Sequence, residues 1–273
     1  MFLCGRYRFA LDRPLVMGII NVTPDSFSDG GRHDSAAAAI SHGLRLREEG
    51  ADILDIGGES TRPGARPVSG QEELDRVMPV LEGLLHCGAA LSVDTMKPAV
   101  MRAALAAGAD MVNDVNAFRA EGAVEAVAGG ESGLCVMHMQ GEPRTMQAAP
   151  HYGNVVAEVC AFLGARLAAL HSAGVARERL VVDPGFGFGK TLEHNLALFK
   201  SLGDLVDMAP VLVGVSRKSM LGLLTGRDVD RRMPASVAAA VLAVQRGAAI
   251  LRVHDVAETM DAINVWQALG EQQ

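Results

Sequence analysis

The chain has 273 residues, of which 49% are hydrophobic and only 4% aromatic, and its formal net charge is -7 at pH 7. This length is close to the roughly 250 residues of a barrel built from eight βα units, so one domain over residues 1–273 accounts for it. The acidic balance argues against nucleic acid or a membrane surface as a partner, because both attract a basic excess. Any anionic ligand must therefore be held by local positive groups.

The cysteines and the N-terminal segment indicate a cytoplasmic protein. Four cysteines lie far apart in the sequence, namely Cys4, Cys87, Cys135 and Cys160. They form no CxxC or Cys/His metal spacing, so free thiols in a reducing compartment are expected. Residues 1–14 are interrupted by charges and hold no apolar core of signal-peptide length. The longest apolar stretch, "ASVAAAVLAV" at 235–244, is about half a membrane span.

Short apolar runs alternate with longer helical patterns along the whole chain, which is typical of βα units with parallel strands. The predicted strands are 15–20, 53–56, 90–93, 111–112, 134–137, 180–182, 211–215 and 250–253. Helical patterns such as 34–50 and 155–174 lie between them, with apolar residues at three- and four-residue spacing. The predicted helix stops are Gly50, Gly88, Gly108 and Gly174. The sequence thus predicts an α/β fold, a single (β/α)8 TIM barrel.

A polar residue lies at or just past the end of every predicted strand. These residues are Asn21, Asp55 with Glu59, Asp94, Asn113 with Asp114, His138, Asp183, Ser216 with Lys218, and Arg252 with His254. In a barrel the carboxyl ends of the strands converge on one mouth, and that face carries the active site. Helix caps and salt bridges alone would place polar residues at only some of these ends. The pattern therefore predicts a functional site at the mouth.

The cations of this set follow the last strand, in "RVHD" at 252–255. Arg252 and His254 are two residues apart, so their side chains should point the same way. With Arg62 of "GGESTRPG" they could hold a phosphate or diphosphate, which barrels often bind near their last strands. The alternative is that Arg252 pairs with a neighbouring aspartate and that His254 is a packed, hydrogen-bonded residue.

The segment 183–191, "DPGFGFGKT", ends like the Walker A loop that binds nucleotide phosphates. That motif requires glycine where this chain has Pro184, so the nucleotide-binding match fails. The glycines instead suggest a close backbone approach to a flat ligand or to an adjacent loop, with Phe186 and Phe188 as walls. Packing of the loop alone is the alternative interpretation.

Asp94, Asn113, Asp183 and Lys218 form a predicted set of buried polar residues. Buried charges are costly, so these groups must pair with one another or match a ligand. Two carboxylates, an amide and an ammonium suit a heterocycle with an amino-amide edge. Two alternatives stay open. One is a salt-bridge network centred on Lys218, and the other is a Schiff-base lysine of an aldolase, whose pKa burial would lower.

Several motifs together resemble the dihydropteroate synthase family, the target of sulfonamides. They are "MGIINVTPDSFSDGG", "DIGGESTRPG", "SVDTMKPAV", "NDV", "MHMQGEPRTMQ", "DPGFGFGKT", "VGVSRKSMLG" and "RVHDV", in order between about residues 14 and 266. The resemblance implies a pterin-binding barrel that transfers alkyl or aryl groups other than methyl. It would join 6-hydroxymethyl-7,8-dihydropterin diphosphate to 4-aminobenzoate in folate biosynthesis, releasing diphosphate and forming 7,8-dihydropteroate. Mg²⁺ as cofactor, a cytoplasmic location and a homodimer are also implied.

The resemblance assigns roles to matching positions of this chain. The pterin pocket would comprise Asp94, Asn113, Met139, Asp183 and Lys218. The diphosphate site would comprise Asn21, Thr61, Arg62, Arg252 and His254, with Asn21 also holding Mg²⁺. The 4-aminobenzoate side would comprise Phe27, Pro63, Phe188 and Ser219, and the lid loop Thr23, Pro24, Asp25, Phe27 and Asp29. The catalytic residues would be Asn21, Arg62, Lys218, Arg252 and His254.

These residue types suit the implied chemistry. Asp183 can accept two N–H bonds from the amino-amide edge of a pterin. Departure of diphosphate leaves a carbocation-like centre, so Mg²⁺, Arg252 and His254 would act mainly by stabilising the leaving charge. The attacking arylamine is a neutral nucleophile near pH 7 and needs no strong general base. The chain accordingly shows no obvious His/Asp or Cys/His dyad.

Other functions were weighed against this one. A pterin-binding methyltransferase of the corrinoid pathway has a similar barrel but no use for a diphosphate site, so "NVTPDSFSDGG" together with "RVHDV" argues against it. An inactive pterin-binding paralogue is a further alternative, although every position with a role is filled. An aldolase would leave Asp94, Asn113 and Asp183 without a joint purpose. Met96 departs from the small residue of some relatives and was expected to touch no residue with a role.

Overall fold

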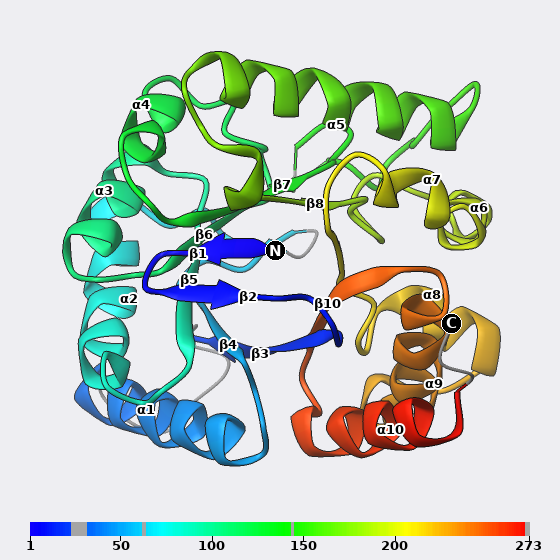
Figure 1. The fold of residues 1–273 in the computed structure, drawn as a ribbon, viewed down its shortest axis with the longest axis horizontal. Helices are drawn as coiled ribbons and strands as arrows, with labels where there is room; N and C mark the ends of the chain where they lie inside the picture. Colours follow the sequence, from blue (N-terminus) through cyan, green and yellow to red (C-terminus); the bar gives the residue numbers. More distant parts are fainter. Residues whose placement is uncertain (23–31, 62–63, 143–144, 271–273) are drawn as a thin grey trace.

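Eight parallel strands close into a barrel with helices around the outside, which confirms the predicted fold class (Figure 1). The strands are β3 (Leu15–Asn21), β4 (Ile53–Gly57), β5 (Ala90–Asp94), β6 (Met111–Asp114), β7 (Gly133–Met137), β8 (Leu180–Asp183), β9 (Val211–Val213) and β10 (Ala248–Val253). Pairing of β10 with β3 closes the ring. The computed structural model describes residues 1–22, 32–61, 64–142 and 145–270, with the side chains of 32–34 left undescribed.

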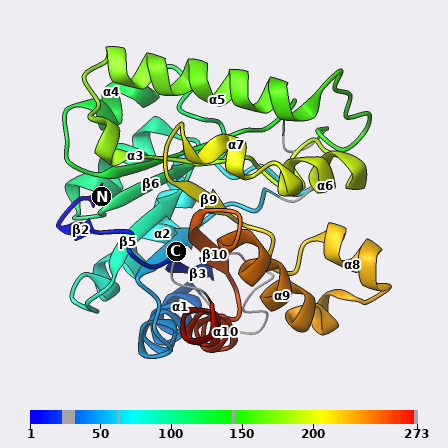
Figure 2. The same ribbon diagram turned by 45° about the vertical axis from the view of Figure 1, so that its right-hand side comes forward.

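Helices fill the connections between the strands. They are α1 (Arg32–Glu48), α2 (Gly70–Leu84), α3 (Pro98–Ala106), α4 (Ala123–Ala128), α5 (Val155–Ser172), α6 (Leu192–Lys200), α7 (Gly203–Val206), α8 (Ser219–Thr225), α9 (Met233–Val244) and α10 (Val256–Leu269). The 3-10 turns are η2 (Arg177–Arg179) and η3 (Val229–Arg231). Figure 2 shows α5 along the top of the barrel and α8 and α9 at the right. The four predicted glycine stops all adopt the left-handed conformation that ends many helices.

Alternation along the strands divides the apolar residues into two cores. In β3, Val16 and Ile20 point outward into the large core between strands and helices. Leu15 and Met17 point inward, where they pack with the inward residues of the other strands. The lower barrel is therefore filled with apolar side chains, and polar residues face inward only toward the carboxyl ends of the strands.

An N-terminal hairpin that the sequence did not predict covers the opposite, amino end of the barrel. Its strands are β1 (Phe2–Cys4) and β2 (Tyr7–Phe9), which pair antiparallel. Phe2 and Cys4 are fully buried against the inner core. Arg6 in the turn forms an ion pair of 2.8 Å with Asp110, which precedes β6. The hairpin thus leaves the carboxyl end as the accessible end of the inner core.

Helix α5 corrects the expectation about apolar stretches. Within the described part of the chain it is the helix that could cross a membrane by length and composition, whereas the sequence had suggested only about half a span. One such helix is a weak indication, because a helix of a barrel can pass the same test. Val155, Val159 and Leu163 are buried at four-residue spacing, and the Arg166 Nε donates to the Ala117 carbonyl at 2.9 Å. These contacts are those of a helix packed on a barrel.

Candidate functional site

Arg252 lies inside the mouth of the barrel between two carboxylates. Its Nε donates to Asp55 Oδ2 at 2.6 Å, and its Nη2 donates to Asp94 Oδ2 at 2.9 Å. Burial alone would lower the pKa of Arg252, but the two carboxylates raise it above the ordinary value. Burial raises the pKa of Asp94 to about 7, although Arg252 opposes this shift. The alternative of a paired Arg252 is thus what the structure contains, and the ion-pair network is centred on Arg252 instead of Lys218.

The buried polar residues converge around this cluster. Asp94 and Asn113 are paired positions of neighbouring strands, and the Asn113 amide donates to Asp55 Oδ2 at 3.2 Å. Asp183 lies close by, beyond Gly214. A Cβ placed on Gly214 would be 3.7 Å from the Arg252 Cβ and 3.9 Å from Asp183 Oδ2. Gly214 therefore places no side chain between Arg252 and Asp183.

Lys218 reaches the same region from the segment after β9. Its Nζ donates to the carbonyl of Phe186 and lies 4.7 Å from the centre of the Phe188 ring. Burial lowers the pKa of Lys218 to about 8, and the charge of Asp183 opposes this shift. Ser219 follows at the start of α8 and is exposed. Lys218 therefore links the carboxylate cluster to the aromatic wall.

A small apolar cluster forms this wall. Its buried members are Val115, Met137, Met139 and Met146, and Met96 and Phe188 pack against it. Met139 and Phe188 thus lie together, as their predicted roles require. Met96 touches this cluster, so the expectation that it contacts no residue with a role is wrong. The prediction that Phe186 forms a wall beside a flat ligand is wrong. Phe186 is fully buried in the outer core, with its ring centre 5.8 Å from that of Phe199.

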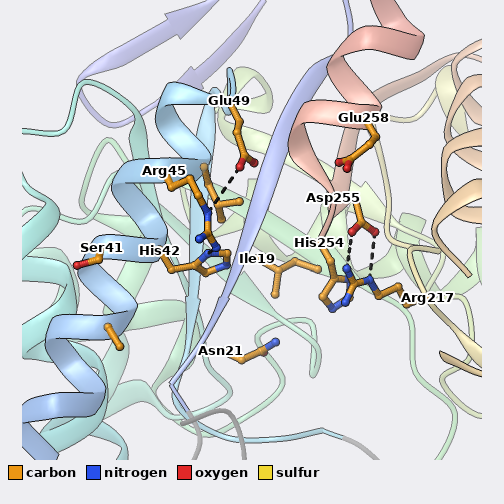
Figure 3. Close-up of a pocket in the computed structure, with 12 residues that line it drawn as sticks. Ile19, Asn21, Ser41, His42, Arg45, Glu49, Arg217, His254, Asp255 and Glu258 are labelled. Carbon is orange, nitrogen blue, oxygen red and sulfur yellow. Dashed lines mark hydrogen bonds and ion pairs between the residues drawn. The ribbon is translucent and has the colours of Figure 1, made fainter. Parts of the chain in front are cut away.

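Asn21 and His254 line a cavity of about 760 Å³ that lies between α1 and α10 and extends to Glu49 and Glu258. Figure 3 shows His42 and Arg45 of α1 on one side of the end of β3, and His254 and Arg217 on the other. The His254 Nδ1 lies 3.0 Å from Ser216 Oγ, so this histidine is hydrogen-bonded as well as accessible from the cavity. Arg217 is held by an ion pair with Asp255. The structure thus brings two of the predicted diphosphate residues together, while Arg252 lies in the carboxylate cluster.

Some predicted site residues lie at the edge of the described ranges or outside them. Thr61 is half-buried after β4, but the positions that follow it lie outside the described residues. The predictions outside the described ranges concern Arg62, Pro63, Thr23, Pro24, Asp25, Phe27 and Asp29. Their assigned roles stay predictions.

Two polar residues at strand ends do not face the mouth, which corrects the expectation that all of them converge there. Asp114 accepts hydrogen bonds of 2.7 Å from the backbone N–H groups of Asn116 and Phe118. His138 is buried and packs edge-on against Phe162 of α5, with ring centres 4.9 Å apart. Each of the two follows an inward-pointing residue by one position, so alternation turns it toward the helices.

Two contributors to the mouth received no role from the sequence. Asp55 is fully buried and holds both Arg252 and Asn113, and Lys190 is buried behind the loop after β8. Asp55 could have been found from its place in a buried strand, because a buried carboxylate needs a cationic or N–H partner. For Lys190, the failed Walker match argued against binding of nucleotide phosphates, and the sequence suggested no other role.

The chain is similar to several known proteins. A family model described as "Pterin binding enzyme" matches residues 17–254. The dihydropteroate synthase of Neisseria meningitidis serogroup C is 53% identical over 272 residues, covering 97% of this chain and 96% of the relative. The solved structure of Xanthomonas albilineans dihydropteroate synthase with 4-aminobenzoic acid has a TM-score of 0.91 at 57% identity, covering 96% of this chain and 95% of that one. Its complex with 7,8-dihydropteroate has a TM-score of 0.89 at 54% identity, covering 97% of each chain.

The role of Asp55 as the partner of Arg252 leads to a prediction about stability. Asp55→Asn removes one of the two charges that compensate the buried guanidinium, and breaking such a pair should lower the free energy of unfolding by about 3 kcal/mol. Urea denaturation measures the change, with Asp261→Asn on the exposed face of α10 as the matched control. A change below about 1 kcal/mol, typical of exposed pairs, would contradict the assigned role.

Proposed function

The chain belongs to the pterin-binding enzyme family and, within it, to the dihydropteroate synthases, and on this premise we propose how its barrel mouth works. The protein is a transferase that joins 6-hydroxymethyl-7,8-dihydropterin diphosphate to 4-aminobenzoate and forms 7,8-dihydropteroate and diphosphate. The observation that carries the assignment to this mouth is that Asp94, Asn113, Asp183 and Lys218 converge near the buried Arg252.

The pterin would lie among these polar groups. Asp183 already accepts the Gly185 N–H through Oδ1 at 2.7 Å, and its Oδ2 lies on the side of Gly214. That oxygen and the carboxylate of Asp94 can accept N–H bonds from the amino-amide edge. Lys218 would donate to a ring oxygen or nitrogen, since an ammonium carries only donors. Met139 would contact the face of the ring.

The diphosphate would extend toward the cavity that Asn21 and His254 line. Arg252 lies between the two regions and could exchange its contact with Asp94 for a phosphate oxygen. Stabilisation of the leaving charge by such donors is worth about 3 kcal/mol for each group in comparable enzymes. Arg62 and Thr61 are proposed to complete this site on the strength of the family resemblance.

Mg²⁺ fits the residues at this end of the mouth. Asn21 is exposed there and offers a carboxamide oxygen, and the described residues contain no group of three or more His, Cys, Asp or Glu side chains that could bind a metal on their own. Mg²⁺ commonly takes one or two protein oxygens and completes its shell with phosphate oxygens and water. When bound it would neutralise charge that develops on the diphosphate. Asn21 would orient the ion beside His254.

The 4-aminobenzoate would approach along the wall formed by Phe188. The Xanthomonas albilineans relative has been solved with 4-aminobenzoic acid, and the same binding is proposed here. The Phe188 ring lies 4.7 Å from the Lys218 Nζ, and the exposed Ser219 is the next residue in the sequence. Ring stacking and a hydroxyl donor suit an aromatic acid. Pro63 and the lid loop with Phe27 are proposed to close this side.

The alternative functions explain these observations less well. A corrinoid methyltransferase would not need the cavity beside Asn21 and His254, and relatives at about half identity or more are dihydropteroate synthases. An aldolase would leave the carboxylate cluster unexplained. An inactive paralogue is distinguished by the activity assay below.

A homodimer is proposed from the surface of the last helices. Large hydrophobic side chains are exposed on α8, η3, α9 and α10, namely Leu223, Leu224, Val229, Leu242, Val265 and Leu269. A groove of about 450 Å³ lies between α9 and α10 and includes Trp266. Exposed apolar patches of this kind mark interaction surfaces. The four free cysteines support a cytoplasmic location, which fractionation of the native cell would test.

The activity assay is the first test of the proposed function. Purified protein supplied with both substrates and Mg²⁺ is expected to release diphosphate in step with 7,8-dihydropteroate, and EDTA is expected to stop the release. Chromatography of the product and a coupled diphosphate assay measure the two outputs. Binding of the pterin substrate without release of diphosphate would identify an inactive paralogue and overturn the proposal.

The pKa of Lys218 predicts how pterin binding depends on pH. This lysine is charged below a pKa of about 8, so above pH 8 the dissociation constant of the pterin substrate should rise about tenfold per pH unit. Arginine stays charged over this range, so the dissociation constant of the Lys218→Arg variant should not rise above pH 8, whatever its value at neutral pH. Ionisation of the ligand itself contributes equally to both curves. Parallel curves from pH 7 to 10 in titration calorimetry would remove Lys218 from the pterin site.

The proposed dimer surface is tested by sedimentation velocity. The protein is expected to sediment as a dimer, and Val265→Asp is expected to shift it to a monomer, because the charge would be buried without a partner. Leu44→Asp is the control, since Leu44 is also an exposed hydrophobic residue but belongs to α1 and not to the last helices. A monomer in the unmodified protein, or a dimer that survives Val265→Asp but not Leu44→Asp, would reject this surface.

A further inference from the structure

The Walker-like segment contains a lysine that the proposed function does not use. Lys190 is only 3% exposed, and it turns back into its own loop instead of reaching a ligand. Its Nζ lies 2.9 Å from the Gly185 carbonyl, 3.0 Å from the Phe188 carbonyl and 2.9 Å from Nδ1 of His138. The nitrogen thus fastens the loop after β8 to the residue that follows β7.

These bonds hold in either protonation state of the lysine. Burial lowers the pKa of Lys190 to about 7, and the charge of Asp183 opposes this shift. An ammonium offers three donors and a neutral amine two, so both carbonyls can be satisfied in each case. Burial and the neighbouring Lys190 lower the pKa of His138 to about 3, which keeps its ring neutral. A neutral ring nitrogen can serve as acceptor or donor toward Lys190.

The loop backbone is shaped to meet this nitrogen. Gly185, Gly187 and Gly189 all have φ between +63° and +79°, the left-handed region that favours glycine, and the carbonyls of Gly185 and Phe188 meet the Lys190 nitrogen. A Cβ on Gly185 would lie 1.9 Å from the His138 carbonyl oxygen, so only glycine fits this approach. Asn195 of α6 accepts the Gly187 N–H at 2.8 Å and holds the outer turn. The predicted close backbone approach is therefore to the adjacent loop.

The same loop carries three features of the proposed site. The Gly185 N–H binds Oδ1 of Asp183, the Phe186 carbonyl accepts from Lys218, and the Phe188 ring lies under the Lys218 ammonium. The two carbonyls held by Lys190 belong to the first and third of these residues. A shift of the loop would therefore move the pterin contacts and the aromatic wall together.

We propose that Lys190 is a positioning residue that fixes the loop 183–190 as the common wall of the pterin and 4-aminobenzoate pockets. This inference rests on the proposed function. Lys190 acts through Gly185 and Phe188 and not on the substrates. Without it, two buried carbonyls and a buried histidine would lose a partner, which is costly enough to let the loop rearrange.

The test compares Lys190→Met with Lys190→Gln in the full-length protein. Met keeps the apolar stem and deletes the nitrogen, whereas Gln keeps two N–H donors. Lys190→Met is expected to raise the KM for 4-aminobenzoate and the dissociation constant of the pterin substrate about tenfold, and Lys190→Gln should recover much of both losses. Lys200→Met, at the exposed end of α6, is the matched control and should leave both constants unchanged.

A purely structural role would give a different result. Lys190→Met would then lower the melting temperature while the folded protein kept the KM and the dissociation constant of the unmodified chain, and this outcome would overturn the inference. If Lys190→Met does not fold, Lys190→Leu, which also lacks the nitrogen, replaces it, and unchanged constants for both ligands in that variant overturn the inference equally. Calorimetry with the pterin substrate in EDTA needs no turnover, so failure of the proposed activity in the unmodified protein stays distinguishable from failure of the inference.

Discussion

The pairing of Arg252 with Asp55 and Asp94 is the interaction on which the mouth of the barrel depends. The guanidinium starts on β10 and reaches past β3 to carboxylates on β4 and β5, a span and a forked geometry that suit arginine. Buried ions cost several kcal/mol each unless they are paired, so the three charges are tolerable only together. Asp55 extends the cluster by accepting from Asn113 as well. One carboxylate without direct substrate contact thus orients two side chains that are proposed to touch substrate.

This pairing determines how Arg252 could contact a phosphate group of the substrate. Arg252 does not offer an unpaired charge to an anionic diphosphate, because Asp55 and Asp94 already neutralise it. The amino-amide edge of a pterin can satisfy Asp94, however, and in doing so it would release one arm of the guanidinium for phosphate. The two halves of one substrate would then bind in a mutually supporting way. The apolar lower barrel, closed by the N-terminal hairpin, confines this exchange to the carboxyl end.

The fold and the position of the polar residues at the mouth could be predicted because both follow from periodicity, whereas the roles of single residues were implied only by the family resemblance. Apolar runs separated by helical patterns gave the eight strands, and polar residues after those runs marked the mouth. Alternation also determines which of two adjacent polar residues faces inward. It turns Asp114 and His138 toward the helices, although their position at strand ends alone suggested the mouth. The sequence did not indicate which charged residues pair, because partners such as Asp55 and Arg252 are 197 residues apart along the chain. The hairpin was missed because strands of three residues are too short to show a period.

The loop after β8 shows why similar letters can serve opposite purposes. In a Walker A loop the backbone N–H groups face outward around phosphate and the lysine reaches the same ligand. Here Pro184 has no N–H to offer, and the carbonyls of Gly185 and Phe188 face the inside of the loop. Carbonyls attract a cation or a donor, so the lysine is drawn inward to Gly185 and Phe188. Lys190 is therefore hydrogen-bonded within its own loop and does not face substrate. The lysine proposed to contact substrate is Lys218, which follows the next strand, β9.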